Sequence, residues 1–406
     1  MFDGWRRNLF SVTAASFIGF AGFTLVMPFL PLYFQELGVT DVGHIALWSG
    51  LSLGATPAVT AIMAPFWGRL ADRYGRKIMV ERSLVSFVIV MSAMAFVTRP
   101  WHVFALRALQ GLFAGYGMLA LTMAADSAPP GKLATAIGTV QTAQRLGPAV
   151  GPVVGGVLAG VVGLRRAFLV SAAFYVCGLL LVAVGYRERA STPRETAGGE
   201  GQRVTFRSVL AFENLVLLMG VIFGLQVVDR SLGPILPLYV AEAGVDPGRV
   251  AFTSGLLFSL AAFAGAVGNQ TSAWLLRRAP ARAIIGGAAA VGAVAAVGFA
   301  ALPHVGTMAL SSALFGLSLG TAMTAAYTAA GSVIPEDVRG TGFGLLTSAT
   351  LVGLALSPMA SGLLGAVSIR AVFLVDGVAL AVIARVVWRL MAVRPSEPQQ
   401  PSAEEI

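Results

Sequence analysis

Six charged side chains lie at least five residues inside long apolar stretches of this sequence, where a charge is costly. They are Arg107, Arg145, Asp229, Arg230, Asp376 and Arg385. Placing such a residue at the centre of a membrane costs roughly 2.5–3.5 kcal/mol, so it usually marks a pathway for ions or substrates. A carboxyl group there can bind and release a proton, and Asp229 is the main candidate for this chemistry. Arg385 lies near the end of its stretch, where a long side chain can reach the polar interface.

Asp229 also has two alternative interpretations. It can belong to a structural ion pair, with Arg145 or Arg107 as its partner, or it can lie at the periphery. Arg230 need not be the partner, because adjacent positions of a helix point about 100° apart. Asp376 lies about two turns into the last apolar stretch, and its position assigns it no role.

The composition indicates a chain that mostly faces something other than water. Of 406 residues, 56% are hydrophobic and 12% are charged, whereas soluble domains carry about 25% charged residues. The single cysteine, Cys177, excludes an internal disulfide framework. The basic residues form short clusters between apolar runs, a pattern typical of membrane orientation rather than of nucleic-acid binding. The sequence contains no metal-ligand cluster, nucleophilic triad, phosphate loop or dinucleotide motif, so we expect no cofactor, no metal and no enzymatic activity.

Membrane-spanning helices must position these charges, and a span needs about 20 mostly apolar residues. Twelve stretches qualify: 9–34, 45–67, 78–98, 102–125, 134–160, 166–186, 214–240, 250–273, 283–302, 306–330, 340–364 and 369–392. In the connecting segments, Lys and Arg are far more frequent on the side that includes the N-terminus. The sequence therefore predicts an all-α integral membrane protein with both termini in the cytoplasm.

The second half of the chain repeats the first. Residues 28–39 read PFLPLYFQELGV and residues 234–245 read PILPLYVAEAGV, and the offset of about 205 residues continues along the chain. We predict two six-helix bundles, 1–186 and 213–394, joined by a cytoplasmic linker at 187–212 and followed by a disordered tail at 395–406. Two such bundles of equal orientation are a transporter architecture. The prolines in both copies predict a break near the outer end of the first and seventh spans.

A charged loop joins the second and third stretches and reads GRLADRYGRKIMV, residues 68–80. It resembles the loop signature of the major facilitator superfamily, and the resemblance extends over essentially the whole chain. In that family the loop is thought to hold the two bundles together on the cytoplasmic side. The resemblance implies that Asp72 faces the helix that opens with GTGFG at 340–344, and that Arg73 or Arg76 meets Asp126. The residues of this expected latch are Gly68, Asp72, Arg73, Gly75, Arg76 and Asp126. The alternative is an ordinary loop with orienting charges.

Two further motifs resemble the twelve-span drug:proton antiporters of this family. Residues 106–115, LRALQGLFAG, are similar to an R-x-x-Q-G pattern, which implies that Arg107 assists a proton-carrying carboxylate. Residues 147–156, GPAVGPVVGG, are similar to the antiporter motif, which is associated with export. The motif residues are Gly147, Pro148, Gly151, Pro152, Gly155 and Gly156. The alternative is a tightly packed helix pair, since glycines let helices approach closely.

The sequence departs from this branch in its first span, which lacks an acidic residue between Asp3 and Glu36. Phe23 occupies the position equivalent to Asp229, so proton coupling must be carried by the second half. Polar, aromatic and methionine side chains suit an adaptable substrate cavity, although some of them will only pack helices. The candidates are Phe23, Gln141, Gln144, Arg145, Gln226, Arg230, Met323 and Tyr327.

These features together predict a secondary transporter of the cell (inner) membrane that exports amphipathic small molecules by alternating access, coupled to protons. The expected partners are a small-molecule substrate, protons and membrane lipid, with no nucleic acid, and we expect a monomer. One alternative is a facilitator or symporter of a specific anionic or lipid-like solute. Another is a receptor or membrane enzyme that transports nothing.

Overall fold

The computed structural model describes residues 4–129, 132–187, 214–301, 303–334 and 339–391. All regular structure in these ranges is helical. The helices are α1 Gly4–Leu25, α2 Leu30–Glu36, α3 Val42–Tyr74, α4 Arg76–Met94, α5 Pro100–Phe113, α6 Tyr116–Ser127, α7 Leu133–Val162, α8 Leu164–Gly185, α10 Leu215–Glu242, α11 Pro247–Leu276, α12 Ala281–Ala301, α13 Val305–Val333, α14 Arg339–Val367 and α15 Ile369–Leu390. By length and composition, ten of them can cross a membrane. The predicted linker beyond Arg187 and the predicted tail lie outside the described residues.

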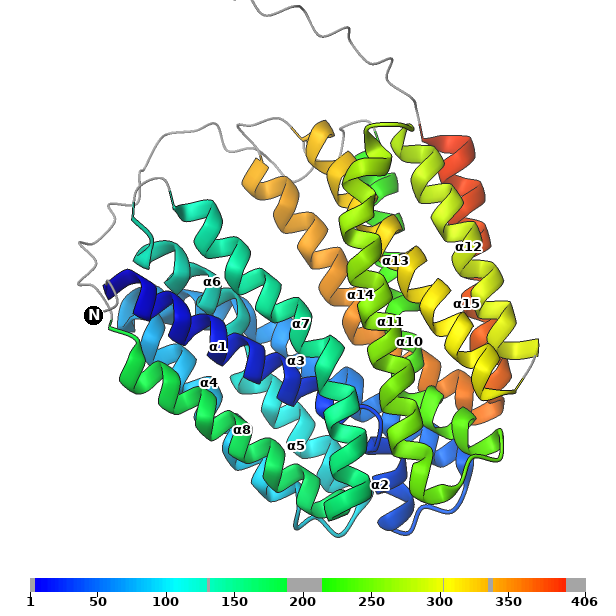
Figure 1. Ribbon diagram of the computed structural model, residues 1–406, viewed down its shortest axis with the longest axis horizontal. Coiled ribbons are helices and arrows are strands. Elements are labelled where there is room, and N and C mark those ends of the chain that lie inside the picture. The colour runs from blue at the N-terminus through cyan, green and yellow to red at the C-terminus, as the bar shows by residue number, and fades with distance from the viewer. Residues whose placement is uncertain (1–3, 130–131, 188–213, 302, 335–338, 392–406) are drawn as a thin grey trace, which may run out of the picture.

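The helices form two bundles that lie side by side, α1–α8 and α10–α15 (Figure 1). Within the first bundle, α1 packs on α7, α3 packs on α5 and α4 packs on α8. Within the second bundle, the equivalent pairs are α10 on α14, α11 on α13 and α12 on α15. The repeat in the sequence is therefore a repeat of helix packing.

Equivalent tyrosines tie the helices of each bundle together near one end. The hydroxyl of Tyr33 donates to the carbonyl of Met94 at 2.6 Å, and the hydroxyl of Tyr239 donates to the carbonyl of Phe299. Both tyrosines are buried, so these bonds satisfy hydroxyl groups that have no access to water. The Leu-Tyr pair shared by both copies is thus explained by one contact made twice.

Equivalent ion pairs close the same end of each bundle. Arg165 Nε lies 2.7 Å from Glu36 Oε1, and Arg370 Nη2 lies 3.3 Å from Glu242 Oε1. All four side chains are exposed, so each pair contributes little to stability. Their placement at equivalent positions shows that the twofold pattern extends to the ends of the helices.

The two copies of the Pro-x-x-Pro segment differ in structure. Helix α1 ends at Leu25 and α2 begins at Leu30, so the predicted break occurs in the first copy. Helix α10 runs without interruption from Leu215 to Glu242, with Pro234 and Pro237 inside it. The predicted break of the seventh span is therefore wrong.

We attribute the difference to the helix that packs on each copy. A side chain at Gly155 of α7 would collide with the carbonyl of Leu25, so α7 presses directly on the point where α1 ends. The positions in α14 equivalent to Gly151 and Gly155 are Ser357 and Ser361. Serines thus replace two glycines of the first bundle, and the hydroxyl of Ser357 donates to the carbonyl of Val227 in α10.

The predicted fourth span is also interrupted, between α5 and α6. Gly115 has a φ of 119°, a conformation that residues other than glycine rarely adopt. The carbonyl of Phe113 accepts from Ser83 and Arg82 of α4. Side chains of the neighbouring helix therefore satisfy a backbone group at the interruption.

Candidate functional site

The two bundles touch each other at one end along two seams. In the first seam α3 lies on α14, and a side chain at Gly50 would collide with the carbonyl of Pro358. In the second seam α7 lies on α11, and a side chain at Gly255 would collide with the carbonyl of Pro152. Both seams involve the beginning of one helix and the end of its partner. The bundles are therefore closed against each other at the end where α3 and α11 begin.

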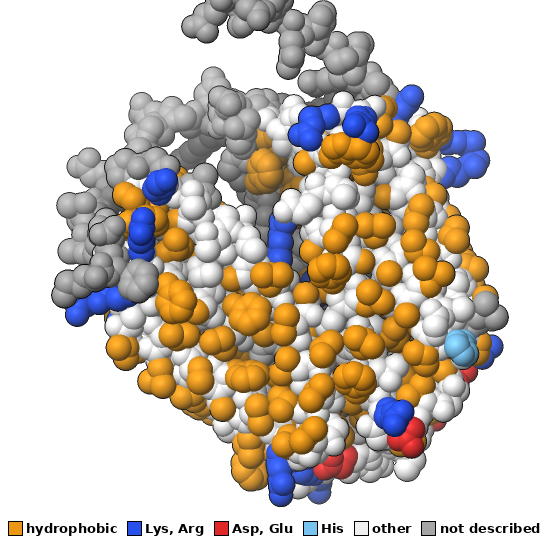
Figure 2. All heavy atoms as spheres, viewed as in Figure 1, with side chains coloured by type: hydrophobic (Ala, Val, Ile, Leu, Met, Phe, Trp, Pro, Cys, Tyr) orange, Lys and Arg blue, Asp and Glu red, His pale blue; other side chains and the backbone are white. Residues whose placement is uncertain are grey.

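A cleft separates the bundles toward the opposite end. Polar side chains of α7 (Thr139, Thr142, Arg145) and of α14 (Thr347, Ser348) are exposed there, although both helices are long apolar spans. Polar side chains exposed within a span usually face a water-filled cavity rather than lipid. Figure 2 shows the molecule hollowed between the bundles, with a basic side chain on the wall of the hollow.

Asp229 and Arg230 form an ion pair on α10. Arg230 Nε lies 3.0 Å from Asp229 Oδ2, and the two side chains are 35% and 38% exposed. Arg230 is therefore the partner of Asp229, and neither Arg145 nor Arg107, the two partners named in the ion-pair interpretation, forms this pair. The long side chain of arginine bends back far enough to overcome the divergence of adjacent positions. The approach is not aligned as a hydrogen bond, because Arg230 Nε has no hydrogen-bond partner.

Arg107 lies deep inside the first bundle. Its side chain is 1% exposed, its Nη1 donates to Gln110 Oε1 at 2.9 Å, and its Cζ lies 5.8 Å from the centre of the Phe23 ring. Its Nε and Nη2 have no hydrogen-bond partner, and the described residues offer it no carboxylate. A buried guanidinium group with two unpartnered nitrogens can bind an anion or water.

The other predicted substrate-binding residues fall into three groups. Three of them engage in helix packing: Gln144 Nε2 donates to the carbonyl of Gly117, Gln226 is buried beside Gly353, and the hydroxyl of Tyr327 lies 2.5 Å from that of Thr350. Gln141 and Arg145 are exposed on α7, on the wall of the cleft. Phe23 and Met323 are half-buried.

The predicted latch is present only in part. Arg76 Nη1 lies 2.8 Å from Asp126 Oδ2, so Arg76 rather than Arg73 is the partner of this acid. The guanidinium group of Arg73 lies over its own neighbour, 5.4 Å from the centre of the Tyr74 ring. Gly68 and Asp72 belong to α3, but their surroundings lie outside what the structure describes. Gly75 ends α3 with a φ of 94°. The observed pair joins α4 to α6 within one bundle and does not connect the two bundles.

Asp126→Asn is expected to lower the free energy of unfolding by about 0.2–1 kcal/mol, because the Arg76–Asp126 pair is partly exposed. In an Arg76→Gln background the same change is expected to cost nothing further. A double-mutant cycle on the purified protein measures this difference. Equal effects in the two backgrounds would show that the pair contributes nothing.

The glycines of the antiporter-like motif contact two different partners. Gly147, Gly151 and Gly155 face α1, where an added side chain would collide with its backbone between Phe17 and Leu25. Gly156 faces α11, where an added Cβ would lie 2.5 Å from the carbonyl of Ala251. Pro148 and Pro152 lie inside α7 without interrupting it. The motif thus joins α7 to its own bundle on one side and to the other bundle on the other side.

The comparison with known proteins agrees with this arrangement. The model of the Major Facilitator Superfamily matches residues 12–313 and 282–405, which together cover nearly the whole chain. The chain belongs to the Major Facilitator Superfamily. As a member it is a secondary transporter rather than an enzyme, and a multi-pass membrane protein, as the sequence predicts.

Curated relatives agree with the predicted branch of the superfamily. The chain is 36% identical over 256 residues to the multidrug resistance protein MdtG of Yersinia enterocolitica, over 63% of this chain and 62% of that protein. It is 33% identical over 266 residues to MdtG of Proteus mirabilis, over 65% and 66% of the two chains. The match thus spans slightly less than two thirds of these relatives.

Solved structures show the same fold. A bacterial homologue of the human lysosomal transporter Spinster, in an inward-facing and occupied conformation, superposes with a TM-score of 0.78 at 17% identity, over 94% of this chain and 95% of that one. The nucleoside transporter NupG superposes with a TM-score of 0.75 at 14% identity, over 95% and 100%. The all-helical membrane fold predicted from the apolar stretches is confirmed.

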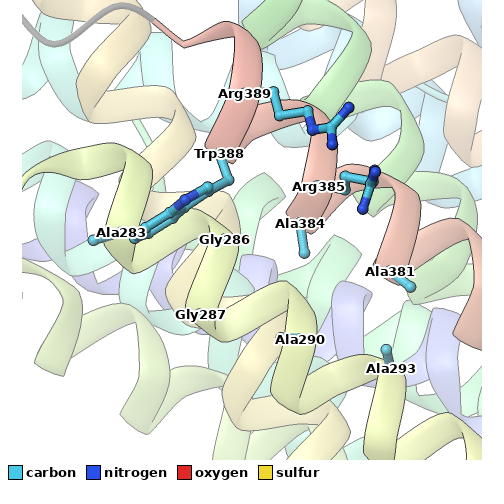
Figure 3. A pocket seen from close by; sticks show the side chains of 10 residues that line it. All are labelled: Ala283, Gly286, Gly287, Ala290, Ala293, Ala381, Ala384, Arg385, Trp388 and Arg389. Atoms are coloured by element: carbon cyan, nitrogen blue, oxygen red, sulfur yellow. The ribbon is translucent and has the colours of Figure 1, made fainter.

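A second hollow of this transporter, a groove of about 750 Å³, lies between α12 and α15. Its lining is mainly alanine and glycine, and the ring of Trp388 lies against Gly286 of α12 (Figure 3). Arg385 and Arg389 line the same groove from α15 (Figure 3). Neither α12 nor α15 packs extensively on the first bundle, so the groove is separate from the cleft.

Sequence reasoning missed two parts of this transporter. The glycine seams at Gly50 and Gly255 were visible only as members of repeated Ser-Gly-Leu triplets, and nothing in the sequence indicated which helix they approach. Arg82, near the start of the predicted stretch 78–98, belongs to α4 and stacks on the ring of Trp67 at 3.4 Å. A single charge near the end of an apolar stretch does not indicate such a contact. No group of three potential metal ligands occurs among the residues that the structure describes.

Proposed function

We propose that this protein is a proton-coupled exporter of amphipathic small molecules that works by alternating access. The observation that carries the proposal is a polar cleft that opens between the bundles at one end only. The closed end is held by backbone contact at glycines, so rocking of the bundles about the cleft would open one end as it closes the other. Carboxyl, guanidinium, aromatic and methionine side chains lie in the wall of the cleft or next to it.

The helices add up to twelve spans on this proposal. Helices α1 and α2 form one span with a break, and α5 and α6 form another. Helix α4 is a span that begins with the charged residues Arg76, Lys77, Glu81 and Arg82. Residues 1–186 and 213–394 are then the two six-helix domains, 187–212 the linker between them and 395–406 a tail. Because Lys and Arg gather at the end where the cleft opens, that end is cytoplasmic, and both termini lie there.

We infer a role for each site residue from its position. Asp229 is accessible from the cleft and would take up and release the coupled proton, with Arg230 balancing its charge when it is ionised. Arg107 would assist from within the first bundle, where its unpartnered N–H groups can donate hydrogen bonds to an acceptor. Gln141, Arg145, Phe23 and Met323 would contact substrate. The latch at Asp72, Arg76 and Asp126 would close when the cleft closes.

The relatives called multidrug resistance proteins support efflux as the direction and drugs as the substrate class. The test uses inverted membrane vesicles with an imposed pH gradient and a fluorescent amphipathic cation. Vesicles that contain the protein are expected to accumulate the cation, and a protonophore is expected to abolish the accumulation. Vesicles from cells that lack the protein are the control. Accumulation that persists after collapse of the gradient would contradict proton coupling.

A specific anionic solute is the second candidate. It is favoured by Arg145, which is exposed on the cleft wall and makes no hydrogen bond or ion pair among the described residues. Measuring cellular accumulation of an anionic and a cationic probe, before and after collapse of the proton gradient, separates the two. An exporter loses its effect when the gradient collapses, so accumulation rises, whereas accumulation through a symporter falls.

A further inference from the structure

We propose that Asp376 is a second proton-binding site of this transporter, carrying a proton in the conformation described here and fixing α10 against α15 through Ser231. The inference rests on the proposed proton coupling only for its role in the cycle. Its evidence is the burial and the hydrogen bonds of the Asp376 carboxyl group, which has no role in the mechanism proposed for Asp229.

Asp376 is buried between helices of the second bundle. Its side chain is 5% exposed, and its Oδ2 lies 2.5 Å from the hydroxyl oxygen of Ser231 on α10. The hydroxyl oxygen of Ser231 also lies 2.9 Å from the carbonyl of Val228. A serine hydroxyl carries one hydrogen, so Ser231 can donate to only one of these two oxygens at a time.

When the carboxyl of Asp376 is protonated, both hydroxyl hydrogens of this hydrogen-bonded series have an acceptor. Asp376 then donates to Ser231, and Ser231 donates to the carbonyl of Val228. The ionised carboxylate would take the serine hydrogen for itself and would receive no other hydrogen bond from the described residues. A buried carboxylate with one neutral donor and no cation is unfavourable, and such a group takes up a proton instead.

No cation balances Asp376 from the helices packed around it. On α12, every residue from Ala283 to Ala301 is apolar, and α14 carries no ionisable residue from Gly342 to Val367. On α15 itself, Arg370 pairs with Glu242, and Arg385 lies nine residues further along in the groove of Figure 3. On α10, Asp229 and Arg230 pair with each other, so their charges largely cancel.

The first bundle shows that packing does not require a carboxyl group here. The residue of α8 equivalent to Asp376 is Ser171, and its hydroxyl donates to the carbonyl of Gly22 at 3.4 Å. Gly22 is in turn the equivalent of Val228. In the first bundle one serine hydroxyl donates to this backbone carbonyl directly. In the second bundle Asp376 contacts Ser231, and Ser231 contacts the equivalent carbonyl. What this replacement adds is a group that can hold a proton.

The position of Ser231 on α10 links the protonation of Asp376 to the cleft. Ser231 follows Asp229 by two residues, so the chain from Asp376 fixes the stretch of α10 that carries the cleft carboxylate. A conformation in which Asp376 reaches water would tolerate the ionised form, whereas the present one would not. Raising the pH is thus expected to shift the bundles away from the cleft-open conformation.

Infrared spectroscopy of the purified protein tests the protonation directly. The wild type at neutral pH is expected to show a C=O stretch of a protonated carboxyl that is absent in Asp376→Asn. Asp41→Asn, at an exposed helix cap where asparagine also caps, is the matched control and is expected to keep the band. A spectrum of Asp376→Asn that is identical to the wild type would overturn the proposal.

A distance measurement tests the conformational role. Spin labels at Thr139→Cys on α7 and Thr347→Cys on α14, with Cys177→Ser, report the opening of the cleft. With Asp229 intact, Asp376→Ser is expected to fold, because it restores the pattern of the first bundle, and to lose at least half of the pH-dependent change in distance. An unchanged pH dependence in Asp376→Ser would overturn this role. Both measurements are made without transport, so their outcome is independent of whether the protein exports drugs.

Discussion

Asp229→Asn is expected to lower gradient-driven accumulation in inverted vesicles by at least about fivefold, the lower end of measured coupling between sites. Asparagine has nearly the size of aspartate but cannot exchange a proton. Because the Asp229 side chain is more than one-third exposed and its partner is the adjacent Arg230, the substitution removes no buried packing. Exchange of labelled for unlabelled substrate, which needs no net proton movement, is expected to continue in the variant.

Three comparisons make the Asp229 prediction specific. Asp229→Glu keeps a carboxyl group and is expected to retain part of the gradient-driven accumulation. Asp246→Asn, at the exposed start of α11, changes a carboxylate outside the cleft and is expected to match the wild type. Asp229→Asn with intact accumulation would contradict the assignment of the coupled proton to Asp229. Loss of both accumulation and exchange would indicate damage to the substrate site instead.

The repeat was the most informative feature of the sequence, because it recorded contacts that the fold makes twice. Tyr33 and Tyr239 could be matched by register alone, and they make the same bond to a carbonyl in a neighbouring helix. The apolar stretches predicted the spans for a similar physical reason. A bilayer imposes a minimum length and polarity on a helix regardless of its neighbours.

The partners of the charged residues could not be predicted in this way. Asp229 pairs with Arg230 because a long side chain can bend back along its own helix, which the spacing of positions does not show. Arg107 forms no ion pair with a described carboxylate, because its side chain is buried inside the first bundle and donates to Gln110. Helix α10 continues through Pro234 and Pro237, whereas the first copy of the same two prolines lies at a break between α1 and α2. The surroundings of Arg107 are set by tertiary contacts, whereas the Asp229–Arg230 pair is set by the conformation of one long side chain, and the spacing of residues in the sequence specifies neither.

Gly255→Val is expected to reduce transport by about tenfold or more, because it prevents the closed end of the molecule from closing. A Cβ at position 255 would collide with the carbonyl of Pro152 and lie 2.9 Å from its carbonyl carbon. These are backbone atoms of a helix that is fixed on its other side by the contacts of Gly151 and Gly155 with α1, so they cannot move aside locally. Overpacking of this kind costs about 1–3 kcal/mol, and about 1.4 kcal/mol changes a population tenfold.

The same substitution is expected to separate the ends of α7 and α11 that face away from the cleft opening. Spin labels at Val161→Cys and Arg249→Cys, two exposed sites beside this seam, measure the separation in a Cys177→Ser background. Gly138→Val is the matched control, since it lies on α7 with no atom within 4 Å of an added Cβ, and it is expected to leave the distance unchanged. If Gly255→Val kept the wild-type distance while transport fell, the seam would not be the gate, and the loss would have to arise within the second bundle. A longer distance together with the loss of transport would show that glycine at this seam is what allows the outer end to close during each cycle.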